Sequence, residues 1–269
     1  MTEPSTHTYP IMNVDDVHIV YPGASFGSKT HAVRGITLEV VKGETLGLVG
    51  ESGSGKSSLA RAMAGLEKVH AGSISYLGQP LPSNLRLPRS TRLDLQMVFQ
   101  DPGSALNRRR RIGSALADAL GVRTGKAGSS DAVATLLESV GLPASFAHRY
   151  PSEASGGQLQ RVVIARALAA QPQVLIADEP VSALDVSVQA QVLDLLVELR
   201  ARLELTIVFV SHDLGVVRHM CDRIAVMRNG LLVEIGDAEQ VVTVPSDPYT
   251  QMLLDAVPDL DEFTHVTAN

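Results

Sequence analysis

Residues 50–57 have the spacing of a phosphate-binding loop. Their sequence, GESGSGKS, fits the pattern G-x-x-x-x-G-K-[ST]. In such a loop the glycines let the backbone approach phosphate oxygens, while free N–H groups and the N-terminus of the next helix favour negative charge. Lys56 is predicted to contact the β- and γ-phosphates of a nucleotide, and the Ser57 hydroxyl to ligate Mg²⁺. The alternative is a glycine-rich turn between a strand and a helix, with no ligand.

A second candidate site follows a short apolar run at 174–177. Asp178 and Glu179 come directly after this run, which places two carboxylates at the end of a predicted strand. In a phosphate-loop enzyme Asp178 would hold Mg²⁺ through water, and Glu179 would polarise the attacking water as a general base. The alternative is a pair of solvated acids at a strand end.

A serine and two glycines indicate a further anion site. Ser155, Gly156, Gly157 and Gln158 stand at the start of a predicted helix, where a hydroxyl and free N–H groups can bind an anion without a lysine. One chain with two phosphate-binding ends suggests that a neighbouring copy completes the nucleotide site. The alternative is a serine that only caps the helix.

The elements that must position these residues predict an α/β phosphate-loop core. Residues 45–49 are typical of a buried strand, and 58–64 predict a helix that stops at Gly65. The same alternation continues with a helix at 158–170, a strand at 174–177, a helix at 186–203 and a strand at 206–210. Alternating strands and helices predict a parallel sheet covered on both faces, with the sites at the carboxyl ends of its strands.

Other segments predict additions to this core. A small, mostly antiparallel β subdomain before the loop is indicated by runs at 11–14, 17–20 and 36–40, and two further strands are predicted at 73–76 and 94–99, with a loop at 80–88. Helical patches at 112–120 and 131–140, broken by Gly121 and other glycines, predict a helical subdomain insert. Residues 223–236 predict a hairpin around Asn229-Gly230.

Composition excludes several classes of protein. The chain has 269 residues, of which 45% are hydrophobic, so it can bury a sizeable core. A net charge of −6 and the absence of tryptophan argue against nucleic-acid binding. No apolar run reaches the roughly 20 residues of a membrane-spanning helix, and the polar residues 1–10 are not expected to form a signal peptide. Cys221 is the only cysteine, which excludes an intramolecular disulfide and favours a cytosolic setting.

Six motifs resemble those of the nucleotide-binding subunits of ABC transporters, and they occur along the chain in the same order as in that family. The resemblance covers nearly the whole chain. Residues 50–57 are similar to the Walker A loop, 174–179 to Walker B, 154–158 to the signature motif and 182–185 to the D-loop. The resemblance implies that Gln100 is the Q-loop glutamine, His212 the switch histidine and Tyr21 the aromatic that stacks on adenine, with Phe26 as a competitor. Residues implied to bind ATP are Tyr21, Gly50, Glu51, Ser52, Gly53, Ser54, Gly55, Lys56, Ser57, Ser58, Ser155, Gly156, Gly157, Gln158 and Asp185. Those implied to act in catalysis are Glu179, His212 and Gln100, and those implied to hold Mg²⁺ are Ser57, Gln100 and Asp178.

Four of these residues also have simpler interpretations. Gln100 could be an exposed polar residue after a strand, and Asp185 could cap the helix that starts at residue 186. His212 could cap the segment from residue 214 or be a core histidine. Tyr21 could be an ordinary strand residue. The functional interpretation rests on six motifs in the family's order rather than on any single one.

Further stretches resemble the ATPases of peptide, nickel and opine importers. They are 96–102, 182–190 and the segment 247–254 with its Pro-Tyr-Thr sequence. The resemblance implies a nucleotide-binding domain at 11–244, with the helical insert at about 102–170, and a short C-terminal extension at 245–269. It implies ATP and Mg²⁺ as cofactors and a location on the cytoplasmic face of the cell membrane. The implied partners are permease subunits, a second ATPase subunit and an extracytoplasmic substrate-binding protein.

The sequence leaves the cargo and two departures from the family pattern open. Di- or oligopeptides are the expected cargo, with nickel or a metal chelate as the alternative; a soluble ABC ATPase that does not transport is an alternative of another class. Ala154 replaces the leucine that usually begins the signature motif, which favours a weakened half-site and a mixed pair of ATPases. Residues 107–111 are unusually basic, which indicates either a solvated charge run or a contact with an acidic coupling helix of the permease.

Overall fold

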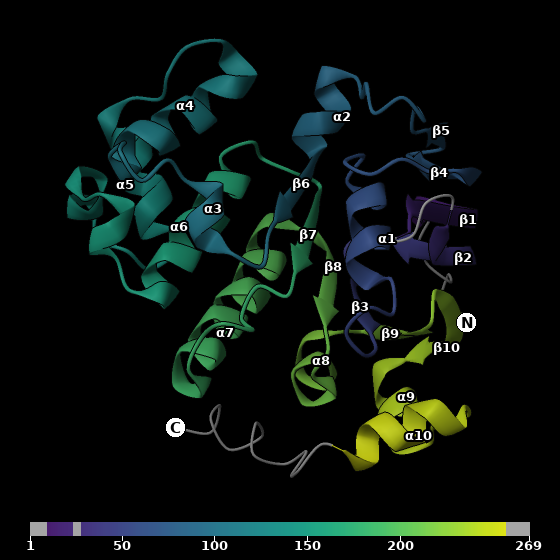
Figure 1. Ribbon diagram of the computed structural model, residues 1–269. Helices are drawn as coiled ribbons and strands as arrows, with labels where there is room; N and C mark the ends of the chain where they lie inside the picture. The colour runs from purple at the N-terminus through teal and green to yellow at the C-terminus, as the bar shows by residue number, and fades with distance from the viewer. Residues whose placement is uncertain (1–9, 24–27, 257–269) are drawn as a thin grey trace, which may run out of the picture.

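The computed structural model describes residues 10–23 and 28–256, and a six-stranded sheet forms its centre (Figure 1). The strand order is β10-β9-β3-β8-β7-β6. The strands are β3 (Thr45–Val49), β6 (Leu95–Val98), β7 (Val174–Asp178), β8 (Thr206–Ser211), β9 (Arg223–Arg228) and β10 (Leu231–Asp237). All neighbours are parallel except β10, which runs antiparallel to β9. The predicted parallel core is therefore confirmed, with one antiparallel strand at its edge.

A second sheet has four antiparallel strands. Two of them come before the phosphate-binding loop in the chain and two come after it. Its order is β2-β1-β4-β5, with bounds β1 (Pro10–Pro22), β2 (Lys29–Val41), β4 (Ala71–Tyr76) and β5 (Gln79–Pro80). It lies beside helix α1 (Lys56–Met63) (Figure 1). Apolar residues from this sheet, from α1 and from one face of the central sheet form one continuous core. The predicted antiparallel β subdomain is thus confirmed, and it packs on the helix that follows the loop.

The opposite face of the central sheet is covered by three helices, α6 (Gly156–Leu168), α7 (Val186–Leu203) and α8 (Leu214–Met220). Side chains of adjacent strand residues alternate between the two cores, as period-2 geometry requires: Val208 packs with the α1 side and Phe209 with the α7 side. Every residue of β3, β7 and β8 is buried. The functional residues that follow these strands therefore start from rigid positions.

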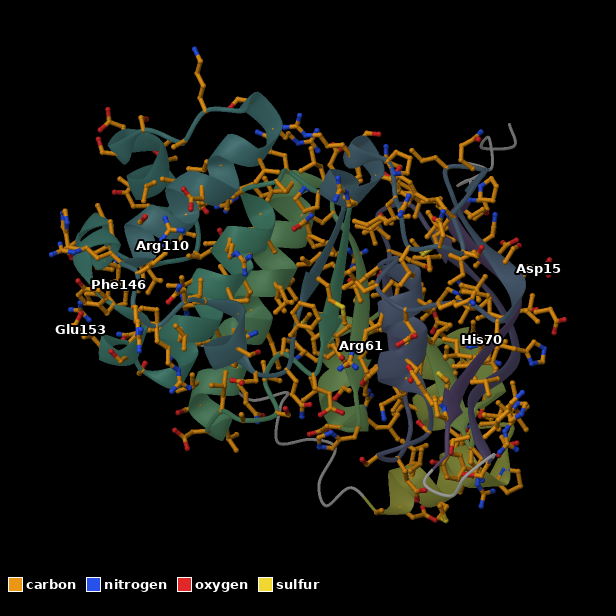
Figure 2. The ribbon with its side chains drawn as sticks, turned by 45° about the horizontal axis from the view of Figure 1, so that its top comes forward. Asp15, Arg61, His70, Arg110, Phe146 and Glu153 are labelled. Carbon is orange, nitrogen blue, oxygen red and sulfur yellow. The ribbon has the colours of Figure 1, made fainter. Side chains whose placement is uncertain are left out.

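A helical lobe separates β6 from β7 in the chain. It consists of α3 (Pro102–Ala105), α4 (Ile112–Thr124), α5 (Ser130–Glu138), the 3₁₀ turns Ala144–His148 and Pro151–Glu153, and α6. Figure 2 shows Arg61 of α1 between this lobe, which carries Arg110 and Phe146, and the antiparallel sheet, which carries Asp15. The helical insert predicted from the sequence is confirmed.

The last described elements are a hairpin and two helices beside β3. Asn229 and Gly230 take positive φ angles of 51° and 82°, the conformation that a two-residue hairpin turn needs, and confirm the predicted hairpin of β9 and β10. Helices α9 (Ala238–Thr243) and α10 (Pro248–Asp255) follow. No helix within residues 10–23 and 28–256 has the length and apolar character needed to span a bilayer.

Three local predictions were wrong. Residues after the loop at 80–88 form a helix, α2 (Arg89–Asp94), so Asp94 ends a helix rather than starting a strand; its carboxylate pairs with Arg123 at 2.9 Å, a contact invisible in the local sequence. The runs at 11–14 and 17–20 are one strand, because the register shifts at Asp15 and Asp16 absorb the break. Gly121 does not interrupt α4, which ends at Gly125 with φ of 76°.

Candidate active site

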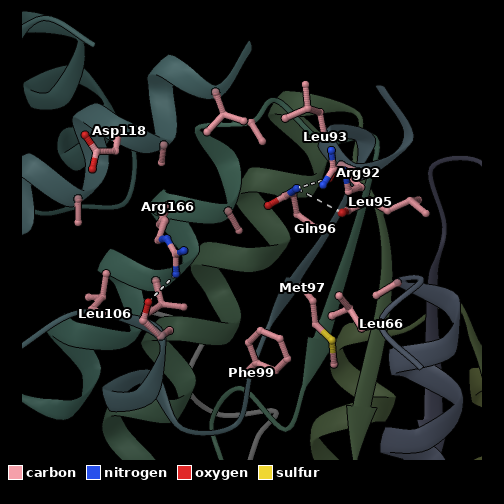
Figure 3. Close-up of a pocket in the computed structure, with 18 of the residues that line it drawn as sticks. Leu66, Arg92, Leu93, Leu95, Gln96, Met97, Phe99, Leu106, Asp118 and Arg166 are labelled. Carbon is pink, nitrogen blue, oxygen red and sulfur yellow. Dashed lines mark hydrogen bonds between the residues drawn. The ribbon is translucent and has the colours of Figure 1, made fainter. Parts of the chain in front are cut away.

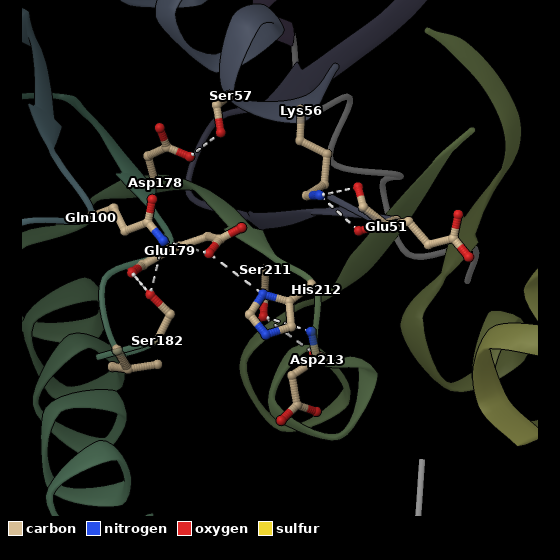
Figure 4. A network of polar contacts seen from close by, with 12 residues as sticks. Glu51, Lys56, Ser57, Gln100, Asp178, Glu179, Ser182, Ser211, His212 and Asp213 are labelled. Carbon is tan, nitrogen blue, oxygen red and sulfur yellow. Dashed lines mark hydrogen bonds and ion pairs between the residues drawn. The ribbon is translucent and has the colours of Figure 1, made fainter. Parts of the chain in front are cut away.

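Four loops that leave parallel strands bring the predicted catalytic residues together. The phosphate-binding loop follows β3, Glu179 follows β7, and His212 follows β8, while Gln100 stands two residues after the end of β6. Figure 4 shows these side chains meeting at the carboxyl edge of the sheet. This confirms the expected location, because the carboxyl ends of parallel strands point to the same edge.

The phosphate-binding loop needs glycine at two positions where other backbone approaches closely. A Cβ on Gly50 would lie 2.1 Å from the Met227 carbonyl oxygen, and one on Gly55 would lie 2.1 Å from the Ala32 carbonyl oxygen. Both glycines also have positive φ, 147° and 103°. The Ser54 hydroxyl in the loop is buried and has no hydrogen-bond partner among the described residues, which fits a site that accepts a polar ligand.

Lys56 is the buried cation of the site. Its residue is 4% exposed, and its Nζ donates to the carbonyl oxygens of Gly50 at 2.7 Å and Glu51 at 2.8 Å. Burial lowers the pKa of Lys56, and the negative charges of Glu179, Asp178 and Glu51 oppose this shift. A phosphate would supply the charge partner that the two neutral carbonyls do not.

Ser57 and Asp178 form the pair that fits Mg²⁺. The Ser57 hydroxyl donates to Asp178 Oδ1 at 2.7 Å, and the Arg61 guanidinium lies 3.9 Å from Asp178 Oδ2. Burial raises the pKa of Asp178, and the hydrogen bond from Ser57 and the charge of Arg61 only partly counter it. A hard divalent cation takes oxygen ligands of this kind and would compensate a buried carboxylate. The donor set and the burial therefore fit the predicted metal.

Glu179 is held by two side chains from other loops. Gln100 Nε2 donates to Glu179 Oε2 at 3.0 Å and to Ser182 Oγ at 3.3 Å, and His212 Nδ1 lies 3.4 Å from the same Oε2. Glu179 has a φ of 46°, a conformation that costs a non-glycine residue about 1 kcal/mol or more. Its N–H donates to the Val210 carbonyl oxygen at 3.0 Å. Among the described residues, no hydrogen bond joins Gln100 to Ser57 or Asp178.

The structure removes the simpler interpretations of His212 and Asp185. Asp213, not His212, caps α8 by accepting from the Gly215 and Val216 N–H groups at 2.9 and 3.3 Å. The His212 side chain is 58% exposed, so it is not a core residue. Asp185 occupies the N-cap position of α7, but its side chain makes no capping hydrogen bond.

Tyr21 lies at the end of β1, half-buried against α1. Its hydroxyl donates to Glu67 Oε2 at 2.9 Å and lies 3.2 Å from Ser58 Oγ. Burial is the main cause of its raised pKa, so the phenol stays neutral. The competing candidate for adenine stacking, Phe26, lies outside the described residues. Tyr21 thus remains a prediction, now placed next to the helix that leaves the phosphate-binding loop.

The signature segment lies at the exposed start of α6. Ser155 and Gln158 form a capping box, so Ser155 does cap α6, as the simpler interpretation expected. Gly157 is required by packing, since a Cβ there would lie 2.2 Å from Val188 Cγ1. Within the described part of the chain, no hydrogen bond or ion pair joins residues 155–158 to residues 50–58. The structure therefore does not bring the two anion sites together.

Three contacts at the site were missed by the sequence reasoning. Arg61 approaches Asp178, Ser182 bonds Gln100, and Tyr249 accepts a hydrogen bond from the Glu51 N–H. Arg61 is four residues after Ser57, so helical spacing could have placed it near the metal site. No local signal could have indicated the other two, because their partners are 82 and 198 residues away in the chain.

Two family models match this chain. Residues 33–182 match the model described as ABC transporter, and residues 233–268 match the model described as oligopeptide/dipeptide transporter, C-terminal region. Among curated proteins, the chain is 47% identical over 231 residues to the oligopeptide transport ATP-binding protein OppF of Salmonella typhimurium, covering 84% of this chain and 69% of that protein. It is 44% identical over 259 residues to the probable D,D-dipeptide transport ATP-binding protein DdpF of Escherichia coli, covering 94% and 80%.

Solved structures share the fold. The ATP-binding cassette MJ0796, in a dimeric post-hydrolysis state bound to ADP and Pi, superposes with a TM-score of 0.71 at 27% identity, covering 84% of this chain and 98% of that chain.

Proposed function

The chain belongs to the ABC transporter family, and on this premise we propose that it is the ATP-hydrolysing subunit that powers an importer of oligopeptides or dipeptides. The convergence of Lys56, Asp178 and Glu179 at one sheet edge carries the ATPase assignment. The match of residues 233–268 and the two relatives named above support peptides over nickel or a metal chelate as cargo.

The nucleotide is held by the loop after β3 and by the end of β7. The loop N–H groups of residues 50–57 bind phosphate oxygens, and Lys56 exchanges its two carbonyl partners for them. Ser57 and Asp178 hold Mg²⁺, which when bound neutralises phosphate charge. Tyr21 contacts the adenine.

Glu179 is the general base of this proposal. It takes a proton from water as the water oxygen bonds the γ-phosphorus and the bond from phosphorus to the bridging oxygen of ADP breaks. Gln100 and His212 orient the carboxylate, because both lie at hydrogen-bonding distance of the same oxygen, Oε2. The strained backbone of Glu179 is consistent with a position selected for function.

A second ATPase subunit completes each site in this proposal. The signature residues Ser155 and Gly156 are exposed at the start of α6, and within residues 10–23 and 28–256 no hydrogen bond or ion pair joins this helix start to the phosphate-binding loop. Such a helix start can bind an anion. Its proposed ligand is the γ-phosphate of the ATP held by a neighbouring subunit. Asp185 at the exposed start of α7 lies on the same side. Closure then requires ATP, because only ATP contacts both subunits.

A groove between β6 and the helical lobe is the proposed docking site for a permease segment (Figure 3). Its volume is about 700 Å³, and Met97, Phe99 and Leu106 give it an apolar floor. Phe99 directly precedes Gln100, so a segment seated here reaches the residue that orients Glu179. Arginines outnumber acids in its lining, with Arg92, Arg110 and Arg166 against Asp118, which favours an acidic partner at the cytoplasmic face of the membrane.

Affinity purification from the native membrane tests this function. The tagged chain is extracted gently with ATP and vanadate present, and an untagged strain serves as the control. We expect two permease subunits, a second ATPase subunit and a substrate-binding protein in the eluate, and this binding protein can then be assayed for peptides. Recovery of ribosomes or DNA-repair proteins without a membrane partner would overturn the transport function and leave the ATPase chemistry intact.

A further inference from the structure

A hydrogen bond connects the C-terminal helix α10 to the phosphate-binding loop. The Tyr249 hydroxyl accepts from the Glu51 N–H at 3.2 Å, although the two residues are 198 positions apart. Tyr249 is 3% exposed, and the Arg228 guanidinium lies over its ring, 4.6 Å from the centroid. The phenol is therefore held in place by burial and by a cation–π contact, independently of its bond to the loop.

The bond acts on the same peptide unit that Lys56 contacts. The Glu51 N–H and the Gly50 carbonyl belong to one planar trans peptide, so they point in opposite directions. Tyr249 bonds its N–H side and Lys56 Nζ bonds its carbonyl side, at 3.2 and 2.7 Å. Rotation of this peptide would break both bonds at once. The orientation of the loop's first peptide and the resting position of the Lys56 ammonium are thus linked through Tyr249.

Helix α10 is itself anchored to the central sheet. Glu234 of β10 accepts from the Ser246 N–H at 2.7 Å and from the Asp247 N–H at 3.2 Å. Burial alone would raise the pKa of Glu234, but hydrogen bonds from its neighbours, Ser246 and Asp247 among them, outweigh it and the pKa is lowered. The turn after β9 also reaches the loop, where the Gly230 N–H donates to the Ser54 carbonyl at 2.9 Å. The loop is therefore contacted near both of its ends by the C-terminal part of the chain.

We propose that Tyr249 is a positioning residue for nucleotide binding, through which helix α10 orients the Gly50–Glu51 peptide and keeps Lys56 at the phosphate-binding loop. The inference rests on the proposed ATPase function. Without the hydroxyl the Glu51 N–H loses its acceptor, and the nucleotide must order the first turn of the loop when it binds. Affinity for nucleotide should then fall, because ordering a flexible loop opposes binding.

Nucleotide binding by the full chain tests the role of Tyr249. Wild type, Tyr249→Phe and a control, Tyr76→Phe, are titrated calorimetrically with the magnesium complex of a non-hydrolysable ATP analogue. Tyr76 is a fitting control, since it is also buried and its hydroxyl lies 3.5 Å from Asp94, away from the loop. We expect the Kd of Tyr249→Phe to rise about five- to tenfold and that of Tyr76→Phe to change less than about twofold.

Two further readouts separate positioning from general stability. Amide hydrogen exchange at Glu51 should be faster in Tyr249→Phe than in wild type, whereas a purely structural role would lower the melting temperature without changing Kd. A Kd for Tyr249→Phe within about twofold of wild type would overturn the inference. Failure of the wild-type chain to bind nucleotide would instead contradict the proposed function itself, so the two failures are distinguishable.

Discussion

Gln100 Nε2 donates a hydrogen bond to Glu179 Oε2 across 3.0 Å, and this bond joins the loop after β6 to the carboxylate after β7. The two residues are 79 positions apart in the chain. Phe99, the neighbour of Gln100, lines the groove of the helical lobe. A partner that moves this loop would therefore also move the amide that holds the Glu179 carboxylate, the proposed general base, and so would couple the proposed docking to hydrolysis.

Loss of the Gln100 amide should impair hydrolysis rather than ATP binding. We expect Gln100→Ala to lower kcat about tenfold and to change KM for ATP less than about twofold, because the carboxylate loses an orienting donor while the phosphate contacts stay. Steady-state ATPase kinetics check this. Gln191→Ala removes an exposed amide on α7 and should match wild type. A large rise in KM with unchanged kcat would contradict the assigned role.

Two N-cap serines on different helices test the proposal that a second subunit completes the nucleotide site. Ser155→Ala and Ser129→Ala each remove a capping serine, on α6 and α5 respectively. Each should cost about 0.5–2 kcal/mol of stability. Only Ser155→Ala should also reduce ATPase activity, by about tenfold or more, because in the proposed assembly only Ser155 faces a neighbouring subunit's nucleotide. Equal ATPase activity in the two variants would contradict a site completed by a second subunit.

Much of this architecture was predictable because its signals are local. Glycine spacing at 50–55, buried apolar runs of β3, β7 and β8, and the Asn229-Gly230 turn each specify conformation within a few residues. Helix α2 was missed because its six residues, Arg89–Asp94, show no helical apolar period and are stabilised by a distant partner, Arg123. The Tyr249 contact with Glu51 was unpredictable for the same reason.

The sequence predicted the sheet edge at which the candidate site residues lie, but not the contacts between them. The motif order indicated Gln100, Glu179 and His212, and parallel strands place their loops at one carboxyl edge, but only the structure shows that Gln100 and His212 both approach Glu179 Oε2. Asp185 illustrates the limit of local rules. Capping preference favours an aspartate at that position, but its side chain makes no capping hydrogen bond.

The raised pKa of Asp178 predicts a pH-dependent stability difference in the nucleotide-free chain. Burial penalises the ionised form in the native state, so wild type should lose stability relative to Asp178→Asn as pH rises through the raised native pKa. Below the ordinary value of 3.8 both states bind the proton, and this contribution disappears. The quantity to compare is the melting temperature of Asp178→Asn minus that of wild type. We expect this difference to be about 2–4 °C larger at pH 7 than at pH 4. A difference independent of pH would contradict this explanation.

The basic segment at 107–111 divides into paired and exposed arginines. Arg110 bonds Asp118 and Ser114, both at 2.6 Å, so its reversal would also disturb the lobe. Arg109 offers the cleaner test of an acidic permease contact. Arg109→Glu should reduce permease recovery about tenfold at low salt, with the deficit shrinking as salt screens it. Lys126→Glu makes the same charge change elsewhere in the lobe and should bind normally. Equal recovery for both variants would mean that Arg109 is only a solvated charge.

The central claim is that Glu179 acts as the general base for ATP hydrolysis, and that this hydrolysis drives uptake. The most direct measurement is peptide uptake and ATP hydrolysis by the purified complex in proteoliposomes, with wild type, Glu179→Gln and the exposed α7 control Glu198→Gln. We predict that Glu179→Gln binds ATP but loses about 100-fold or more in hydrolysis, and uptake with it, while Glu198→Gln matches wild type. Wild-type hydrolysis or uptake by Glu179→Gln would contradict the account.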